Sequence, residues 1–229
     1  MNVVKGLTCG LVLLACAVGG QALALGPVDA EVGAVWWDND YVSNGATADF
    51  DADAGAPGFK AELWIKKAFG FRASRYSSDV DALTAEASDF TSLDFMWRPF
   101  SPSENNFVAI GVGWQESDLA NVGLASDTSG ARINVEGRIA VAGIVYFYGQ
   151  GSYLPELDDA QSVVPGESFA DLSGHEYEVG ASFNFLPVIG FKIGYREQNV
   201  DFTRTDILGT AIKGNSESAG FLGGLTFSF

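Results

Sequence analysis

The sequence contains one histidine, His175, and histidine is the side chain best suited to acid–base chemistry near neutral pH. Its chain neighbours are Gly174 and Glu176, and Asp171 lies four residues before it. His175 could act as a general base if a carboxylate or a serine from another part of the chain approached it. The sequence has no nucleophile elbow, no metal-binding histidine pair and no phosphate-binding glycine loop. We therefore expect no catalytic residues and no enzyme activity.

Closely spaced aspartates are a second set of residues that could do chemistry, because carboxylate oxygens are the ligands that calcium and magnesium prefer. Two such pairs are Asp51 with Asp53 and Asp79 with Asp81. Neither pair continues into a calcium-loop pattern with a glutamate at the right distance. Weak divalent-cation binding stays open. The simpler expectation is that these acids keep surface segments soluble, with no metal site and no cofactor.

The N-terminus has the features of an export signal. Lys5 is the only charged residue before Asp29, and an apolar run over 6–18 is too short to span a bilayer as a helix. The run leads to a small-x-small sequence at 22–24. We predict a signal peptide over 1–24.

The mature domain over 25–229 would then contain no cysteine, because Cys9 and Cys16 both fall in the signal. No disulfide framework and no cysteine metal site is expected in that case. A lipoprotein processing site at Cys16 is the alternative. A barrel that is already anchored by its own surface would gain little from such a lipid.

The mature domain is strongly acidic. Without Lys5, twelve Lys and Arg residues face 29 Asp and Glu residues, which gives a net charge of −17. This charge argues against a nucleic acid partner. The hydrophobic content of the whole sequence is nevertheless 47%, although no apolar run of about 18 residues follows the signal. Apolar residues that never form a long run must alternate with polar ones.

Alternation of apolar and polar residues is the main pattern of the mature domain. A strand puts successive side chains on opposite faces, so each alternating segment has one apolar face and one polar face. Most segments are near the 9–11 residues that a tilted strand needs to cross a membrane. We predict an all-β fold, a closed antiparallel up-and-down transmembrane β-barrel of ten strands, with eight as the main alternative. The ten segments are 28–38, 58–66, 69–78, 91–99, 106–116, 131–141, 144–154, 174–185, 189–202 and 218–229.

The connections between these segments alternate in length. The short ones are Lys66-Lys67-Ala68, 99–105, 142–143 and 186–188. The long, polar ones are 39–57, 79–90, 117–130, 155–173 and 203–217. Short turns at one end and long loops at the other are the arrangement of outer-membrane barrels. An even strand number also returns both chain ends to the short-turn side.

The polar faces of the predicted strands would line the barrel interior. Eight of the twelve cations of the mature domain would then point inward, whereas acids dominate the long connections. The charged residues on these faces are Lys60, Glu62, Lys66, Arg72, Asp94, Arg98, Arg132, Glu136, Arg138, Glu176, Glu178, Lys192 and Arg196.

Two uses of such an interior stay open. Paired networks of Arg and Glu would stabilise a filled lumen, because unpaired buried charges are costly. Excess positive charge in a constricted lumen would instead favour passage of small anionic or polar solutes. The residues we expect to set the selectivity of such a pore are Arg132, Arg138, Lys192 and Arg196. Glycines that would leave space for it are Gly137, Gly149, Gly180, Gly190 and Gly194.

A soluble ligand-binding barrel is the alternative fold, with apolar side chains inside and charges outside. The membrane fold is favoured because the apolar faces carry large aromatic residues, several of them near predicted strand ends, where interfacial girdles lie. These aromatic residues are Phe69, Phe71, Phe95, Trp97, Trp114, Phe183, Phe185 and Phe191.

The last predicted strand carries a recognisable pattern. Phe221, Gly223, Leu225, Phe227 and Phe229 share one face, and Phe229 is the final residue. This resembles the C-terminal strand signal of Gram-negative outer-membrane proteins. The resemblance implies a surface-exposed outer-membrane protein in contact with outer-membrane lipid and lipopolysaccharide. It also implies that the barrel-assembly machinery reads the assembly signal Leu225, Phe227 and Phe229. The size is similar to that of small OmpA-like and opacity-type barrels, but no motif selects a subfamily.

Two families of barrel enzymes have patterns of catalytic residues that can be compared with this sequence. The omptin proteases are also ten-stranded and require a His–Asp pair with a second aspartate pair, but no aspartate lies two residues before His175. Lipid A deacylase barrels require a serine two residues after the histidine, and Tyr177 stands there. We therefore expect a structural barrel. A narrow porin-like pore is the alternative, and an outer-membrane hydrolase is a remoter one.

Overall fold

The computed structural model describes residues 28–45, 50–80, 88–103, 105–118, 124, 127–142, 144–186 and 188–229. Side chains are described for these residues except 50–54, 56, 78–80, 88 and 142. The predicted signal peptide lies outside this part of the chain. No helix long and apolar enough to cross a membrane occurs among the described residues.

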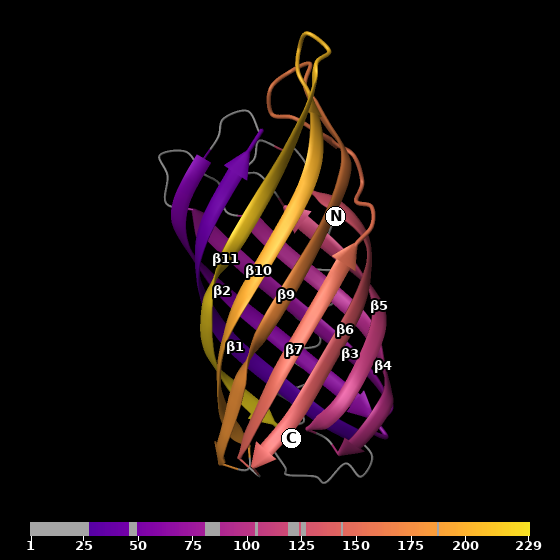
Figure 1. Ribbon diagram of the computed structural model, residues 1–229, viewed down its shortest axis with the longest axis vertical. Coiled ribbons are helices and arrows are strands. Elements are labelled where there is room, and N and C mark those ends of the chain that lie inside the picture. The colour runs from indigo at the N-terminus through magenta and orange to yellow at the C-terminus, as the bar shows by residue number, and fades with distance from the viewer. Residues whose placement is uncertain are drawn as a thin grey trace.

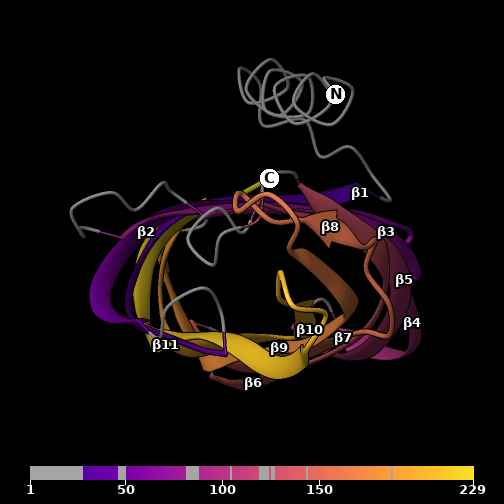
Figure 2. The same cartoon turned by 90° about the horizontal axis from the view of Figure 1, so that it is seen from above.

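Ten long antiparallel strands form one sheet that closes on itself (Figure 1). Consecutive strands are hydrogen-bonded neighbours, and the last strand pairs with the first from Glu31↔Ser228 to Asn44↔Asn215. The closed ring is visible along the barrel axis in Figure 2. The long strands are β1 (Val28–Asn44), β2 (Phe50–Ile65), β3 (Phe69–Val80), β4 (Ser88–Ser103), β5 (Asn106–Asp118), β6 (Thr128–Ala142), β7 (Val145–Leu154), β9 (Ser168–Leu186), β10 (Ile189–Thr205) and β11 (Ala211–Ser228).

The predicted count of ten strands is confirmed, but four of the predicted outer ends, at 38, 58, 174 and 218, are wrong by more than four residues. The predicted loop over 203–217 shortens to 206–210, and in the predicted loop over 39–57 the strands cover 39–44 and 50–57. A two-residue strand, β8 (Ala160–Gln161), pairs with the outer end of β9 and was not predicted. The barrel wall therefore extends well beyond the segments that show apolar–polar alternation.

Both described chain ends lie at the short-turn end of the barrel. The Ala30 amide donates to the Phe229 carbonyl at 3.1 Å, and the Phe229 amide donates to the Ala30 carbonyl at 2.8 Å. Val28 pairs with Ile65, the last residue before the turn at 66–68. The C-terminus, marked C, lies near the base of the barrel in Figure 1, whereas the hairpin between β10 and β11 rises to the top. The predicted placement of the chain ends beside the short turns is confirmed for the described residues.

In the half of the barrel nearer the short turns, apolar side chains face outward. All eight aromatic residues predicted on the outer face are exposed, from 38% for Phe183 to 59% for Phe185. Together with exposed aliphatic residues such as Ile110, Ile139 and Ile193, they form a continuous region, named here the apolar belt. The soluble-barrel alternative placed these side chains inside and is wrong for this half.

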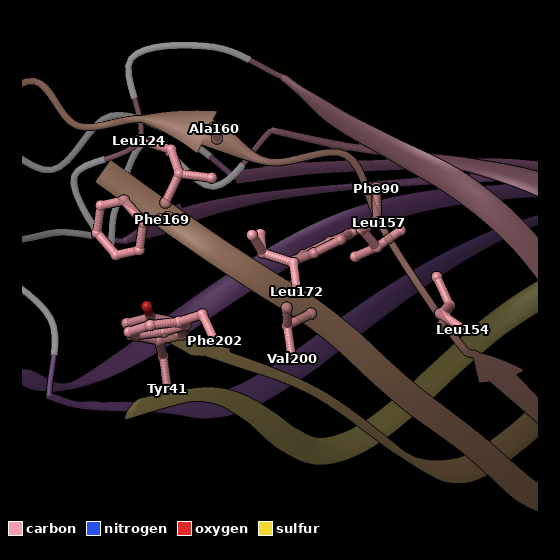
Figure 3. Packing of buried hydrophobic residues seen from close by; sticks show 10 residues of the cluster. All are labelled: Tyr41, Phe90, Leu124, Leu154, Leu157, Ala160, Phe169, Leu172, Val200 and Phe202. Atoms are coloured by element: carbon pink, nitrogen blue, oxygen red, sulfur yellow. The ribbon is translucent and has the colours of Figure 1, made fainter. Parts of the chain in front are cut away.

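In the half nearer the long connections, named here the outer end, the faces exchange character. On β10 the outward residues change from Phe191 and Ile193 to Asp201, while the inward residues change from Lys192 to Phe202. Ten buried apolar residues from five long strands and two connections pack together inside the outer end (Figure 3). They are Tyr41, Phe90, Leu124, Leu154, Leu157, Ala160, Phe169, Leu172, Val200 and Phe202. The outer end is thus built like a soluble protein, with charge outside and a hydrophobic core inside.

The segment after β7 fills the wall and the interior of the outer end. The Leu157 amide donates to the Leu172 carbonyl of β9, and the Asp158 amide donates to the Ser129 carbonyl of β6, both at 2.8 Å. These bonds hold the segment between β6 and β9 where β7 has ended, and Leu157 itself joins the apolar core. Part of the predicted loop over 155–173 therefore folds inward.

Candidate functional site: the charged interior of the barrel

The candidate site is the set of charged side chains enclosed by the apolar belt. Ten of the thirteen charged residues predicted on the inward faces are named here the luminal charge cluster; all ten point inward, and none has more than 7% of its surface exposed. They are Lys60, Glu62, Arg72, Arg98, Arg132, Glu136, Arg138, Glu178, Lys192 and Arg196. Asp94 and Glu176, expected on the same faces, are buried with them.

Two residues change the expected charge of this interior. Lys66 was expected inside, but β2 ends at Ile65 and Lys66 is exposed in the turn. Glu31 was not expected inside, but its carboxylate lies 3.5 Å from Nη1 of Arg138. Side chains alternate between the two faces only within a strand. Lys66 lies in the turn after β2, so the alternation that predicted it to point inward does not apply there. With one cation fewer and one anion more, the interior is close to neutral and lacks the predicted excess of positive charge.

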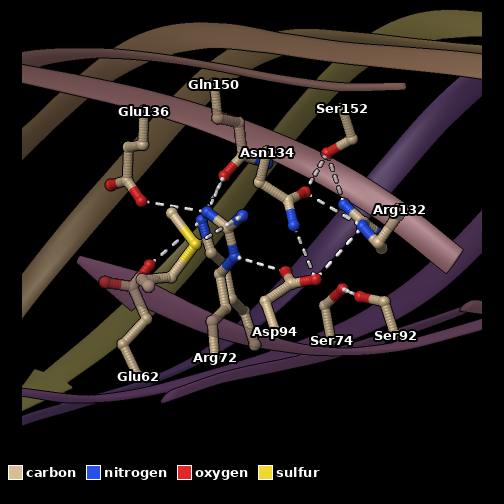
Figure 4. Close-up of polar contacts among 12 residues, drawn as sticks. Glu62, Arg72, Ser74, Ser92, Asp94, Arg132, Asn134, Glu136, Gln150 and Ser152 are labelled. Carbon is tan, nitrogen blue, oxygen red and sulfur yellow. Dashed lines mark hydrogen bonds and ion pairs between the residues drawn. The ribbon is translucent and has the colours of Figure 1, made fainter. Parts of the chain in front are cut away.

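Arg72 of β3 is the central cation of the interior (Figure 4). Its Nε lies 3.1 Å from Oδ2 of Asp94 and its Nη1 lies 2.9 Å from Oε2 of Glu136. Nη1 also donates to Oε1 of Gln150 at 3.0 Å. Arg72 therefore links strands β4, β6 and β7 across the lumen, and a guanidinium suits this role because its five donors lie in fixed directions.

Arg132 and Arg196 share one carboxylate. Arg132 of β6 contacts Oε1 of Glu176, and Nη2 of Arg196 lies 2.7 Å from Oε2 of the same side chain. Arg132 is also held by Asp94 at 3.2 Å and donates to Oε1 of Gln115 at 2.8 Å. Each of these charges has opposite charges or amide oxygens on more than one side, as a charge needs when it is removed from water.

A third group lies nearer the short turns. Arg138 contacts Glu62 and lies 2.7 Å from Oε1 of Glu136, while Lys60 lies 3.2 Å from Oε1 of Glu62. Lys60 also donates to Gln150 at 2.8 Å, which joins this group to Arg72. The interior is therefore one connected network of ion pairs and not a set of separate ones.

The glycines that were expected to leave space lie on both faces of the barrel wall. Gly137 and Gly149 lie on the outward face. Gly180 and Gly194 do face inward, but the Tyr148 side chain covers both, and a Cβ added to either would lie within 2.6 Å of its hydroxyl. Lys192 lies 3.9 Å from the centre of the Tyr148 ring and 2.9 Å from Oε1 of Glu178. The Tyr148 ring therefore occupies the space beside Gly180 and Gly194.

Arg98 is held by stacking. Its guanidinium carbon lies 3.4 Å from the centre of the Trp64 ring and 3.7 Å from that of Phe107, in the layer nearest the short turns. Among the described residues, no hydrogen bond reaches its Nε or Nη1. Stacking on aromatic faces stabilises a guanidinium through cation–π attraction. Arg98 and its two rings therefore pack together at the short-turn end of the interior.

His175 lies within β9 on the outward face, opposite Tyr153 on β7 and Asn199 on β10. It does not point into the charged interior. In the described part of the chain, no three histidine, cysteine, aspartate or glutamate side chains gather as metal ligands would. Of the two aspartate pairs considered for cation binding, the side chains lie outside the described residues.

The three residues of the predicted assembly signal lie on the outward face at the short-turn end of β11. Leu225, Phe227 and Phe229 are 48%, 40% and 49% exposed. They continue the apolar belt across the β1–β11 closure, as the parity of the last strand predicts.

Several network members were not predicted from the sequence. Glu31, Asn134, Gln150 and Tyr148 all point inward and contact the charges. Each lies an even number of residues from a charged or polar position on the inward face of its own strand. This spacing was the signal in the sequence that could have identified it. Their partners could not be read from it, because the partners lie on other strands.

No protein-family model matches the sequence, and no curated protein sequence matches it either. Among solved structures, the outer membrane protease OmpT from Escherichia coli aligns with a TM-score of 0.54 at 10% identity, over 89% of this chain and 97% of that chain. An outer membrane channel from Pseudomonas putida F1 aligns at 0.47 and 11% identity, over 88% of this chain and 95% of that chain. The outer membrane protein OprG from Pseudomonas aeruginosa aligns at 0.37 and 9% identity, over 89% and 96%.

The strand pairing and the similarity to OmpT show the class of fold. The protein is a closed, ten-stranded antiparallel β-barrel of the kind found in Gram-negative outer-membrane proteins. At 10% identity the likeness to OmpT extends to the fold alone. A protease shares this kind of fold, and a fold by itself does not select a function.

Proposed function

We propose that this protein is an integral outer-membrane barrel with a sealed interior and a structural, surface-exposed role. In this proposal the signal peptide over 1–24 directs export and is removed. The apolar belt would face the hydrocarbon of the membrane. The outer end, with its acidic outward face and apolar core, would stand above the membrane at the cell surface. The proposal assigns no reaction to His175 or to any other residue.

The observation that carries the proposal is the burial of the four candidate selectivity residues. Arg132, Arg138, Lys192 and Arg196 are 2–6% exposed, and each has at least one carboxylate partner. A water-filled passage would leave its lining side chains accessible to water and its charges free to meet a solute. Paired and enclosed charges instead favour a role in holding the barrel wall together, which argues against the narrow passive pore.

The apolar core of the outer end is a second barrier above the charged network. Phe169 and Phe202 pack edge to face with their ring centres 5.2 Å apart, inside the wall formed by β9 and β10 (Figure 3). A solute entering from the outside would have to displace this core before it met the first charge. The two layers together support a barrel that is closed along its axis.

Single-channel recording tests the proposal. The mature chain, refolded into a planar bilayer, should give no discrete conductance steps, after heat-modifiable gel migration has shown that it is folded. The Arg132→Ala and Arg196→Ala variants should stay silent and unfold at lower temperature than the parent protein. Discrete steps with anion preference, altered in these variants, would overturn the sealed barrel in favour of the pore.

The outward residues at the end of β11 support a role for a partner protein in the assembly of the barrel. Leu225, Phe227 and Phe229 present an exposed apolar row, and we propose that the barrel-assembly machinery reads it before closure while lipopolysaccharide surrounds the finished barrel. Replacing Phe229 with serine should reduce assembly in cells while leaving refolding in detergent nearly unchanged. Equal loss in both settings would argue against a recognition role.

A further inference from the structure

Three buried polar side chains of the barrel interior each have an atom for which the protein supplies no hydrogen-bond partner. They are Trp37 and Asn39 of β1 and Gln198 of β10, which are 0%, 3% and 2% exposed. Among the described residues, no hydrogen bond reaches the indole Nε1 of Trp37, Oδ1 of Asn39 or Nε2 of Gln198. A polar atom that leaves water without gaining a partner costs free energy, so folded proteins rarely contain one.

Elsewhere in the interior the same residue types are bonded by protein groups. Nε1 of Trp64, which is also buried, donates to Oε2 of Glu62 at 3.3 Å. Asn134 and Gln150 each have hydrogen bonds at both the oxygen and the nitrogen of the side-chain amide. The interior can therefore satisfy an indole and an amide with protein groups alone, and it does not do so at the three atoms named above.

The three side chains lie on the two strands that flank β11, and Arg196 of β10 connects them. Asn39 and Arg196 lie opposite the same residue of β11, Gly220, which has no side chain to separate them. Nη2 of Arg196 donates to Oε1 of Gln198 at 3.4 Å, and its guanidinium carbon lies 5.4 Å from the centre of the Trp37 ring. Nε of Arg196 also has no hydrogen bond among the described residues. These four residues form one group, named here the polar group.

The polar group lies between the charged network and the apolar core. The next inward residues on the same two strands, Tyr41 and Val200, belong to the apolar core. On the other side, Arg196 is paired with Glu176 at 2.7 Å and with Glu178 at 3.5 Å. The charge of the group is therefore already balanced. Its atoms without a protein partner are three N–H donors and one carbonyl acceptor, which suit a neutral molecule that both accepts and donates.

We propose that the polar group binds ordered water molecules inside the barrel. A water molecule accepts and donates hydrogen bonds, so a small cluster can join the N–H donors of the group to Oδ1 of Asn39. The charged network, the bound water and the apolar core are then three successive layers of the interior. The inference does not depend on the role of the protein at the cell surface.

Water contact at the two buried indole groups tests this inference. The mature protein is refolded in deuterated detergent with tryptophan that carries an NMR-active nitrogen isotope, and single Trp→Phe variants assign each indole N–H. Selective excitation of the water resonance should give a nuclear Overhauser cross-peak at the Trp37 indole proton, and the rotating-frame experiment separates direct contact from proton exchange. Trp64 is the matched control, because Glu62 already accepts its proton, and it should show no water contact. Absence of the cross-peak at Trp37 would overturn the inference.

Two glutamine variants show whether the water belongs to the polar group. Gln198→Leu removes one donor of the group and should weaken the Trp37 cross-peak. Gln115→Leu is the control, because this buried glutamine is bonded by Arg132 and Ser117 and lies on β5, so its removal should leave the cross-peak in place. Heat-modifiable gel migration confirms that each variant is folded. Loss of the cross-peak in both variants, or in neither, would overturn the assignment to the polar group, and a silent barrel would leave the proposed function standing.

Discussion

The apolar belt and the outer end are two parts of one continuous sheet with opposite chemistry. Around the belt, Phe191 and Ile193 of β10 face outward and Lys192 is buried among carboxylates; a few residues later Asp201 faces outward and Phe202 is buried among rings. The backbone and the hydrogen-bond ladder are the same in both parts. Each part places its apolar face toward the less polar surroundings, which are outside the barrel at the belt and inside it at the outer end.

The two parts therefore hold the wall together in different ways. The belt interior relies on ion pairs, which are strong only when every partner is present. The outer end relies on a hydrophobic core, whose members contribute in proportion to the surface they bury. Substitutions that act on one mechanism at a time should separate the two parts.

The largest effect is expected from Arg72→Ala, which leaves Asp94 and Glu136 without their central partner. Breaking a buried ion network costs about 3–5 kcal/mol of unfolding free energy, measured by urea titration followed by tryptophan fluorescence. Arg75→Ala is the control, because the exposed pair of Arg75 with Asp89 contributes less than about 1 kcal/mol. Equal losses in the two variants would mean that the interior network does not stabilise the belt.

Phe202→Ala should have the next largest effect, about 3 kcal/mol, because it opens a cavity beside Phe169 in the outer core. The loss should be similar in detergent micelles and in vesicles, since this core does not depend on lipid. A loss found only in vesicles would contradict the assignment of the outer end to water.

A charge placed on the outward face should have a different effect on stability in the apolar belt than in the outer end. Ile193→Arg puts a cation on the apolar belt and should cost about 2 kcal/mol of stability in vesicles, whereas Thr203→Arg, on the same face of the outer end, should be nearly neutral. The pair is compared by reversible unfolding of the refolded barrels. Similar costs at the two positions would mean that the membrane boundary does not lie between them.

A smaller effect is expected where the belt interior is filled by an aromatic ring. Gly194→Ala places a Cβ about 2.6 Å from the Tyr148 hydroxyl, so the ring must move and stability should fall by about 1–2 kcal/mol. Combining it with Tyr148→Phe should recover part of the loss, because the clashing hydroxyl is removed. Gly149→Ala, on the outward face of β7, is the control and should cost less.

The smallest effect concerns the hairpin at the top of the outer end. Oδ1 of Asp206 accepts the Thr210 and Leu208 amides at 2.8 and 2.9 Å, and these bonds, that from Thr210 foremost, lower the pKa of the Asp206 carboxyl. A lowered folded pKa means that the carboxylate stabilises the turn above the ordinary value of about 4 and loses this as pH falls through the folded value. The protection factors of the Leu208 and Thr210 amides, which compare their exchange with that of an unfolded chain at the same pH, should fall in that range. Asp206→Asn should remove the pH dependence, and an unchanged profile would contradict the role of the carboxylate.

Much of the belt could be predicted from the sequence. Ten alternating segments gave the strand number, and parity placed Phe95 outward and Arg98 inward, because a period of two is a local property of the strand. Parity also found the charged residues of the interior. It failed at Lys66, where the strand ends, and at Glu31, which carried no signal apart from its position.

The outer end could not be predicted in the same way. There Tyr41 and Val200 are buried while Asp40 and Asp201 are exposed, so the apolar face shifts to the opposite parity and the polar residues resemble those of a loop. The sequence by itself determined the number of strands, the faces of the belt and the identity of the buried charges. Only the tertiary structure decided which charges meet, as in Arg72 with Glu136 across 64 residues of chain, and where the faces exchange. Both depend on which strands become neighbours across a closed lumen and on which solvent each part of the wall meets, and neither is a local property of the chain.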